Sequence, residues 1–239
     1  MKRVLVSGGS GGIGAAICHE LSRSDWEVIV HANANPERAQ ALAAEIVAAG
    51  GRARSVRFDL VDGAQVSSAL AVLLKSGPIQ GIVHNAGIHD DVPMAGMSAR
   101  QWHSVIDVSL HGFFNLTQPL LLPMLRTRWG RIVALSSVSG LIGNRGQTNY
   151  AAAKAGLHGA VRSLALESGS RGVTVNCVAP GIIDTPMTAG LFDAARIEKL
   201  VPLNRAGTPA EVAGLVGFLM SEQAGYITGQ VVSINGGMT

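Results

Sequence analysis

The amino-acid sequence predicts an α/β domain built on a doubly wound parallel sheet of seven strands, with helices on both faces. Short runs rich in Val and Ile alternate about six times with longer segments of helical period, as is typical of a parallel sheet. Most runs are apolar almost continuously, which indicates strands buried on both faces. The expected strands are residues 3–7, 27–31, 53–59, 79–84, 131–136, 173–179 and 230–234.

Helices are expected between these strands, where Ala and other helix formers recur. Gly50 ends the second helix, Asp62 can cap the third, and Ser98 opens the fourth. Thr208, followed by a proline and an acid, is a start signal for the last helix. The expected helices are residues 14–23, 36–49 and 64–75, one from 98, a long one from about 109 to 127, residues 149–168, and one after Thr208.

Length and composition favour one domain spanning residues 1–239. Of the 239 residues, 47% are hydrophobic and 15% are charged, so the chain can bury a large core. It has no run of about 18 apolar residues and no block of like charge, so we expect neither a membrane span nor a nucleic-acid surface. Cys18 and Cys177 are expected to be free thiols of a cytoplasmic protein, and alone they cannot form a metal cluster.

A glycine-rich loop follows the first strand and opens the first helix. It reads Ser7-Gly8-Gly9-Ser10-Gly11-Gly12-Ile13-Gly14. Its glycines let the backbone approach a diphosphate, whose charge meets free N–H groups at the start of the helix. In this position the motif predicts a dinucleotide site on a Rossmann-type sheet.

The residues after the second strand favour NADPH over NADH. Many dinucleotide sites place an acid about 20 residues beyond the glycine loop, where it bonds the adenosine ribose. The second strand leads here into Ala32-Asn33-Ala34-Asn35, without an acid. A carboxylate at this point would repel a 2′-phosphate, so its absence suits NADPH, although the nearest arginine is Arg38.

Tyr150 and Lys154 form a candidate catalytic pair. They are four residues apart in a helical segment and therefore lie on one helix face. A lysine beside a phenol stabilises the phenolate and lowers the phenol pKa from about 10. Such a tyrosine can donate a proton to a carbonyl oxygen or accept one from an alcohol. Ser137 follows the fifth strand, where open α/β sheets place their sites, and its hydroxyl can hold the substrate oxygen.

With these residues the chain resembles the short-chain dehydrogenase/reductase family over essentially its whole length. Ser137, Tyr150 and Lys154 match the catalytic residues of the family, and the glycine loop matches its cofactor motif. The resemblance implies that Tyr150 donates the proton, Ser137 orients the oxygen, and Lys154 also holds the nicotinamide ribose. Further matches, to segments beside adenine and nicotinamide, are Asp59-Leu60, His84-Asn85-Ala86-Gly87, Pro180-Gly181 and Ile183-x-Thr185.

Within the family, residues 146–156, 226–229 and 235–238 most resemble the members that act on acyl carrier protein. This resemblance implies NADPH-dependent reduction of a 3-ketoacyl thioester in fatty acid or related polyketide and polyene biosynthesis. It also implies a homotetramer, in which Arg128 and Arg171 receive the acidic carrier protein.

Two positions depart from the family pattern. Ser109 stands where the family has a catalytic Asn, whose backbone carbonyl holds a water of the proton relay, and His84 stands where it has the first Asn of its Asn-Asn-Ala-Gly motif. Ser109 keeps a carbonyl and a short polar side chain that can also bond a helix backbone. We expect activity to be retained, with proton resupply altered.

A lid is expected over residues 185–203, between the sixth strand and the last helix. Its apolar residues suit a fatty or aryl-conjugated acyl chain, although such residues also occur in ordinary packing; they are Met187, Leu191, Phe192, Ile197, Leu200 and Val201.

Two other functions stay open at this point. The same residues could reduce a free ketone or oxidise a sugar or steroid alcohol. The altered position at Ser109 also fits a non-catalytic NADP-binding partner subunit, although the intact Ser137, Tyr150 and Lys154 favour an enzyme. Enoyl reduction is disfavoured, because enoyl reductases related to the family space Tyr and Lys more widely.

Overall fold

The computed structural model describes residues 1–186, 188, 190 and 193–239. All seven predicted strands form one parallel sheet in the order β3-β2-β1-β4-β5-β6-β7. The strands are β1 (Lys2–Ser7), β2 (Trp26–Ala32), β3 (Arg52–Arg57), β4 (Gly81–His84), β5 (Gly130–Leu135), β6 (Val173–Pro180) and β7 (Val231–Ile234). This order reverses its direction between β1 and β4, which is the position of ligand sites in doubly wound sheets.

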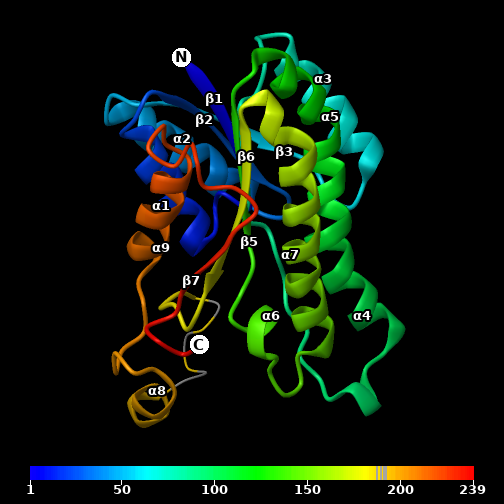
Figure 1. Cartoon of the computed structure of the whole chain (residues 1–239), viewed down its shortest axis with the longest axis vertical. Coiled ribbons are helices and arrows are strands. Elements are labelled where there is room, and N and C mark those ends of the chain that lie inside the picture. Colours follow the sequence, from blue (N-terminus) through cyan, green and yellow to red (C-terminus); the bar gives the residue numbers. More distant parts are fainter. Residues whose placement is uncertain (187, 189, 191–192) are drawn as a thin grey trace.

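Nine α-helices accompany the strands in the described part of the chain. They are α1 (Gly12–Ser22), α2 (Pro36–Ala48), α3 (Gly63–Leu74), α4 (Ala99–Ile106), α5 (Gly112–Thr127), α6 (Ser139–Ile142), α7 (Thr148–Ser168), α8 (Ala194–Leu200) and α9 (Pro209–Leu219). Figure 1 shows α1 and α9 on one side of the sheet and α5 and α7 on the other.

The predicted start signals act as caps. The Asp62 carboxylate accepts hydrogen bonds from the backbone of Ala64 and Gln65 at the start of α3. Ser98 and Thr208 each form a capping box at the start of α4 and α9, respectively. Each capping box pairs two backbone N–H groups that would otherwise lack a hydrogen-bond partner. Because these bonds join residues that are close in the sequence, the starts of these helices could be predicted from the sequence.

The predicted helix start near Ser109 is wrong. Ser109 lies inside a π-helical segment, η2 (Asp107–His111), which joins α4 to α5. Ile106 and Gly112, on either side of it, both keep right-handed helical geometry, so no cap breaks the chain. The short helices α6 and α8 were not predicted either.

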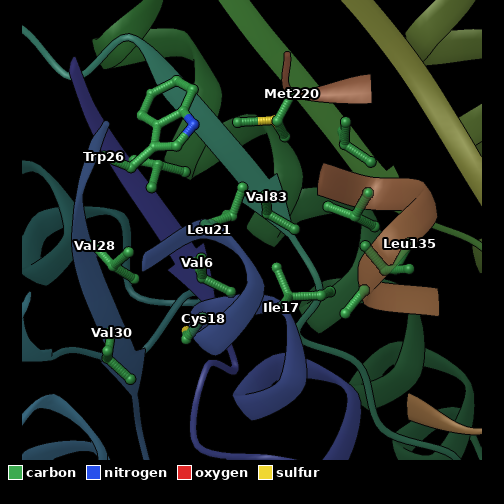
Figure 2. Packing of buried hydrophobic residues seen from close by; sticks show 14 of the residues in the cluster. Val6, Ile17, Cys18, Leu21, Trp26, Val28, Val30, Val83, Leu135 and Met220 are labelled. Carbon is green, nitrogen blue, oxygen red and sulfur yellow. The ribbon is translucent and has the colours of Figure 1, made fainter. Parts of the chain in front are cut away.

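Two apolar clusters hold the sheet between its helices. Alternate strand residues point to opposite faces, so Val4 and Val6 pack with α1, α2 and α9, whereas Leu5 packs with α3, α5 and α7. Figure 2 shows the first cluster, in which Ile17 of α1 reaches the strand residues Val6 and Val83. Cys18 and Cys177 are free, as predicted, and both are buried.

Candidate active site

A cavity of about 500 Å³ lies at the carboxyl ends of the strands. The glycine loop, the ends of β2, β4 and β5, the start of α7 and the segment after β6 form its walls. The predicted cofactor residues that line it are Gly8, Ser10, Gly11, Gly12, Ile13, Gly14, Asn33, Asp59, Leu60, Asn85, Ala86, Gly87, Tyr150, Lys154, Pro180 and Thr185. Gly9, Gly181 and Ile183 belong to the same segments but do not line the cavity.

The glycine loop has the close packing that a diphosphate cradle requires. Gly8 has a φ of +61°, a backbone conformation that favours glycine, and a Cβ on Gly14 would lie 2.2 Å from the carbonyl oxygen of Gly8. Among the described residues, no side chain caps the start of α1, so the N–H groups of its first turn are available to an anion. The residues present therefore fit a dinucleotide diphosphate.

The adenosine end of the cavity carries little negative charge. Asn33, Asn35 and Arg38 line it beyond β2, and Asp59 is the only carboxylate among the described residues of the whole lining. Arg38, identified in the sequence only as the arginine nearest to the end of the second strand, therefore lines the wall of the cavity. Among the described lining residues, no carboxylate directly follows β2.

His31 is a lining residue that the sequence did not single out. Its Nδ1 accepts a hydrogen bond from the N–H of Gly8 at 3.2 Å, and its Nε2 lies 2.9 Å from the carbonyl oxygen of Phe58. Because a carbonyl only accepts, the hydrogen of the neutral ring is on Nε2. His31 therefore ties the glycine loop to the end of β3, and its place at the end of β2 was the signal available in the sequence.

The structure brings Ser137, Tyr150 and Lys154 together. Tyr150 and Lys154 lie one turn apart on α7, with Lys154 Nζ 5.6 Å from the centre of the Tyr150 ring. Lys154 is buried, and its Nζ donates a hydrogen bond of 2.8 Å to the carbonyl oxygen of Leu135. Ser137 follows β5 and hydrogen-bonds Tyr150. The site thus combines a phenol, a hydroxyl and an ammonium group.

Burial dominates the protonation of these groups. It raises the pKa of Tyr150 above its ordinary value, and the hydrogen bond from Ser137 opposes the rise. The prediction that the pKa of Tyr150 is lowered is therefore wrong for this arrangement of protein groups. Burial also lowers the pKa of Lys154 to about 8. At neutral pH Tyr150 keeps its proton and can act as an acid.

The backbone of α7 at Lys154 is tied to Ser136, the residue that follows β5. Ser136 Oγ lies 3.0 Å from the carbonyl oxygen of Lys154 and 2.7 Å from His158 Nε2. The single hydroxyl hydrogen of Ser136 can go to the carbonyl only if His158 donates to the hydroxyl oxygen. His158 was not predicted as part of the site, and its position four residues after Lys154 on α7 was the available signal.

Ser109 does not line the cavity. Its side chain is fully buried, and its hydroxyl finds no hydrogen-bond partner among the described residues. Its carbonyl oxygen lies 2.9 Å from His84 Nε2. Its neighbour Val108 does line the cavity, so the π-helical segment reaches the site through Val108.

The protein is expected to lose stability in mild acid. Burial lowers the pKa of His31 to about 4 and of His84 to about 3, so both stay neutral in the folded state while the unfolded chain takes up protons below about pH 6.5. The unfolded state then binds more protons than the folded state. The free energy of unfolding therefore decreases as the pH is lowered, and at pH 5 it is about 2 kcal/mol smaller per histidine than at neutral pH. Asp59 raises the pKa of His31, whereas Lys154 and His31 lower that of His84.

Urea unfolding at pH 7.5 and pH 5 checks this expectation. His31→Gln removes one of the two groups and should reduce the loss by about half. The control is His103→Gln, because His103 is exposed on α4. Equal unfolding free energies of the native protein at both pH values contradict the prediction.

Arg128 and Arg171 lie together but away from Tyr150. Arg128 follows α5 and Arg171 follows α7, before β5 and β6 begin, and Arg128 Nη2 lies 3.4 Å from the carbonyl oxygen of Ser170. Tyr150 is near the other end of α7, whose 21 residues span about 30 Å at 1.5 Å per residue. Both arginines are exposed at the opposite edge of the sheet.

The segment after β6 is described in part. Thr185 lies against the glycine loop, since its Cγ2 is 3.3 Å from where a Cβ on Gly12 would be. Within the predicted lid, Ile197 and Leu200 lie on α8 and Val201 is buried. Met187, Leu191 and Phe192 lie outside the described residues. Among the residues that are described, no helix has the length and apolar character needed to cross a membrane.

The chain is similar to known proteins over almost its whole length. A family model described as enoyl-(acyl carrier protein) reductase matches residues 8–239. The chain is 42% identical over 239 residues to a 3-oxoacyl-[acyl-carrier-protein] reductase of Aggregatibacter actinomycetemcomitans, covering 99% of each chain. It is 41% identical over 240 residues to the enzyme of that name from Staphylococcus aureus, covering 99% of this chain and 98% of the other. For the Chlamydia muridarum protein the identity is 44% over 246 residues, covering 99% and 97%.

Proposed function

This chain belongs to the short-chain dehydrogenase/reductase family, and we propose that it reduces 3-ketoacyl thioesters on acyl carrier protein to 3-hydroxyacyl thioesters. The observation that carries the proposal is a cavity that begins at the glycine loop and is lined by Tyr150 and Lys154, with Ser137 hydrogen-bonded to Tyr150. The full-length identity to reductases with this named substrate supports the substrate class. The enzyme is then a cytoplasmic NADPH-dependent oxidoreductase of fatty acid biosynthesis.

Each residue of the site has a separate role in the proposed ketone reduction. NADPH, when bound, supplies the hydride for the carbonyl carbon. Tyr150 keeps its proton at neutral pH and donates it to the carbonyl oxygen. The Ser137 hydroxyl, which is bonded to Tyr150, holds the same oxygen in this proposal. Lys154 adds positive charge beside the phenol, where it stabilises the phenolate that proton donation leaves.

The cofactor preference is expected to depend on Asn33. Asn33→Asp puts a carboxylate directly after β2, at the lining of the cavity, where it repels a 2′-phosphate. We expect the ratio of kcat/KM for NADPH to that for NADH to fall at least tenfold, or about 1.4 kcal/mol. Asn204→Asp is the control, because Asn204 is exposed and does not line the cavity. An unchanged ratio in Asn33→Asp contradicts the proposed preference.

A homotetramer is proposed for the assembly. Large apolar side chains stand exposed on the two long helices: Phe114 (63%) and Leu122 (56%) on α5, and Leu166 (87%) on α7. A further copy of the chain would cover such surfaces. Light scattering should give four times the mass of 24.7 kDa; the mass of one chain contradicts the proposal.

The assembly bears on where the carrier protein docks. A carrier protein held by Arg128 and Arg171 sits about one length of α7 from Tyr150 of the same chain. We infer that it serves the pocket of a neighbouring copy. The double charge reversal Arg128→Glu and Arg171→Glu should raise KM at least tenfold for a carrier-protein thioester, while KM for the coenzyme A thioester stays within twofold. Equal changes for both substrates contradict the docking site.

A substrate panel tests the function itself. Acetoacetyl thioesters on carrier protein and on coenzyme A, a free ketone and a secondary alcohol are each assayed with NADPH and with NADH. The proposal expects the highest kcat/KM for the carrier-protein thioester with NADPH. Preference for the free ketone or the alcohol overturns it, and absence of turnover on every substrate indicates a non-catalytic subunit. Longer and conjugated acyl chains then separate fatty acid from polyketide or polyene substrates.

Enoyl reduction is the second candidate, because the matching family model carries that description. It is tested by adding a crotonyl thioester on carrier protein to the panel. Reduction of the crotonyl chain at a rate above that of the acetoacetyl chain would replace the proposed function by this one.

A further inference from the structure

The two positions that depart from the family pattern touch each other. His84 ends β4, and Ser109 lies in η2, 25 residues further along the chain. The Nε2 atom of His84 is 2.9 Å from the carbonyl oxygen of Ser109. Its other nitrogen, Nδ1, is 3.3 Å from Ser7 Oγ. One buried ring thus lies between the start of the glycine loop and the π-helical segment.

The donor and the acceptor of each hydrogen bond made by the His84 ring can be assigned. Burial lowers the pKa of His84 to about 3, so the ring is neutral and has one N–H donor and one acceptor. Since the carbonyl of Ser109 only accepts, Nε2 carries the hydrogen. Ser7 must then donate its hydroxyl hydrogen to Nδ1. The oxygen of Ser7 remains free to accept from the N–H groups of Asn85 and Ala86, both at 3.0 Å.

The segments joined by the ring are walls of the cavity. Gly8 follows Ser7, Asn85 and Ala86 follow His84, and Val108 precedes Ser109; all four of these neighbours line the cavity. The Ser109 side chain contributes no hydrogen bond among the described residues. The polar link between η2 and the glycine loop therefore runs through the His84 ring, which bonds the Ser109 carbonyl. The ring also packs edge-on against the Phe113 ring, with 5.7 Å between the two ring centres.

We propose that His84 is a positioning residue that holds the π-helical segment at Ser109 against the glycine loop, and that positions 84 and 109 act as one pair. The ring does not line the cavity, yet it sets the distance between the glycine loop and the π-helical segment, which form two of its walls. A small residue at 109 belongs to the same pair, because a larger side chain at this fully buried position must shift the local backbone, and with it the carbonyl that the ring bonds. The consequence for turnover rests on the proposed function, whereas the consequence for cofactor binding does not.

A double-mutant cycle tests the pairing. His84→Asn leaves the Ser7 hydroxyl and the Ser109 carbonyl without their partner, and should raise the Kd of NADPH and lower kcat, each about tenfold. Ser109→Asn adds volume at a fully buried position, which shifts the carbonyl bonded by the ring, and should cause losses of similar size. In the double variant the smaller residue at 84 offsets the larger one at 109, and both quantities should return to within about threefold of the native protein. Losses that multiply to about 100-fold overturn the pairing.

Two further measurements separate positioning from stability and from folding failure. Leu70→Ala opens a cavity in the core away from the pocket and should lower Tm at least as much as His84→Asn with an unchanged Kd for NADPH; a raised Kd in this control overturns the assignment. Nitrogen NMR of the native protein needs no variant, and must show a neutral His84 with its hydrogen on Nε2. A native protein that binds NADPH but leaves ketoacyl thioesters unreduced contradicts the proposed function, while the binding and NMR results still decide the role of His84.

Discussion

Tyr150→Phe is expected to lower kcat for ketoacyl reduction by at least about a thousandfold, while the Kd of NADPH stays within about twofold. The change removes only the hydroxyl, which bonds Ser137 and carries the proton for the substrate oxygen. The ring, and with it the contact to Lys154 Nζ at 5.6 Å from its centre, is kept. Binding titrations and single-turnover assays with a carrier-protein thioester measure the two quantities separately.

The chain offers a matched control for this change. Its second tyrosine, Tyr226, is fully exposed and does not line the cavity, so Tyr226→Phe should leave both kcat and Kd unchanged. Turnover near the native rate in Tyr150→Phe would mean that another group donates the proton. In that case Ser137, which bonds the Tyr150 hydroxyl, becomes the next group to test.

Much of the fold could be predicted because its signals are local. Strands buried on both faces, such as Gly130–Leu135 and Val173–Pro180, read as apolar runs. Caps such as Asp62 and Thr208 bond backbone groups within three residues of themselves. Helix α5 was harder, because it begins without a cap: the chain passes through the π-helical segment at Ser109 in unbroken helical geometry.

Residues of the candidate site could be proposed from the sequence where type and spacing carry the chemistry, as with Tyr150 and Lys154. What the sequence could not show are contacts across the fold. The bond from His84 to Ser109 joins β4 to η2, and no spacing rule connects them. The raised pKa of Tyr150 is likewise a result of burial, whereas the pair considered alone predicts a lowered one. The distance of Arg128 and Arg171 from Tyr150 follows from the direction of α7.

The glycine loop supports a second prediction of large effect. Gly14→Ala should raise the Kd of NADPH at least about 100-fold, a loss of about 2.7 kcal/mol of binding free energy. The new Cβ would lie 2.2 Å from the carbonyl oxygen of Gly8, 2.7 Å from Asn85 Nδ2 and 2.9 Å from Gly9 Cα. Two of these atoms belong to the backbone of the loop, so rotation of a side chain cannot relieve the overlap. The first turn of α1 must instead move away from the loop, and the N–H groups that meet the diphosphate move with it.

The overlap should also lower Tm, because the same loop packs on the turn at Asn85, whose Nδ2 donates to the carbonyl oxygens of Ser7 at 3.1 Å and Gly8 at 3.0 Å. Gly159→Ala is the matched control: a Cβ there meets nothing within 4 Å, and replacing glycine inside helix α7 should stabilise the protein by up to about 1 kcal/mol. Its Kd for NADPH should stay unchanged. If Gly14→Ala binds NADPH as tightly as Gly159→Ala does, the close approach of α1 to Gly8 is not what forms the diphosphate cradle, and the loop must hold the cofactor in another way.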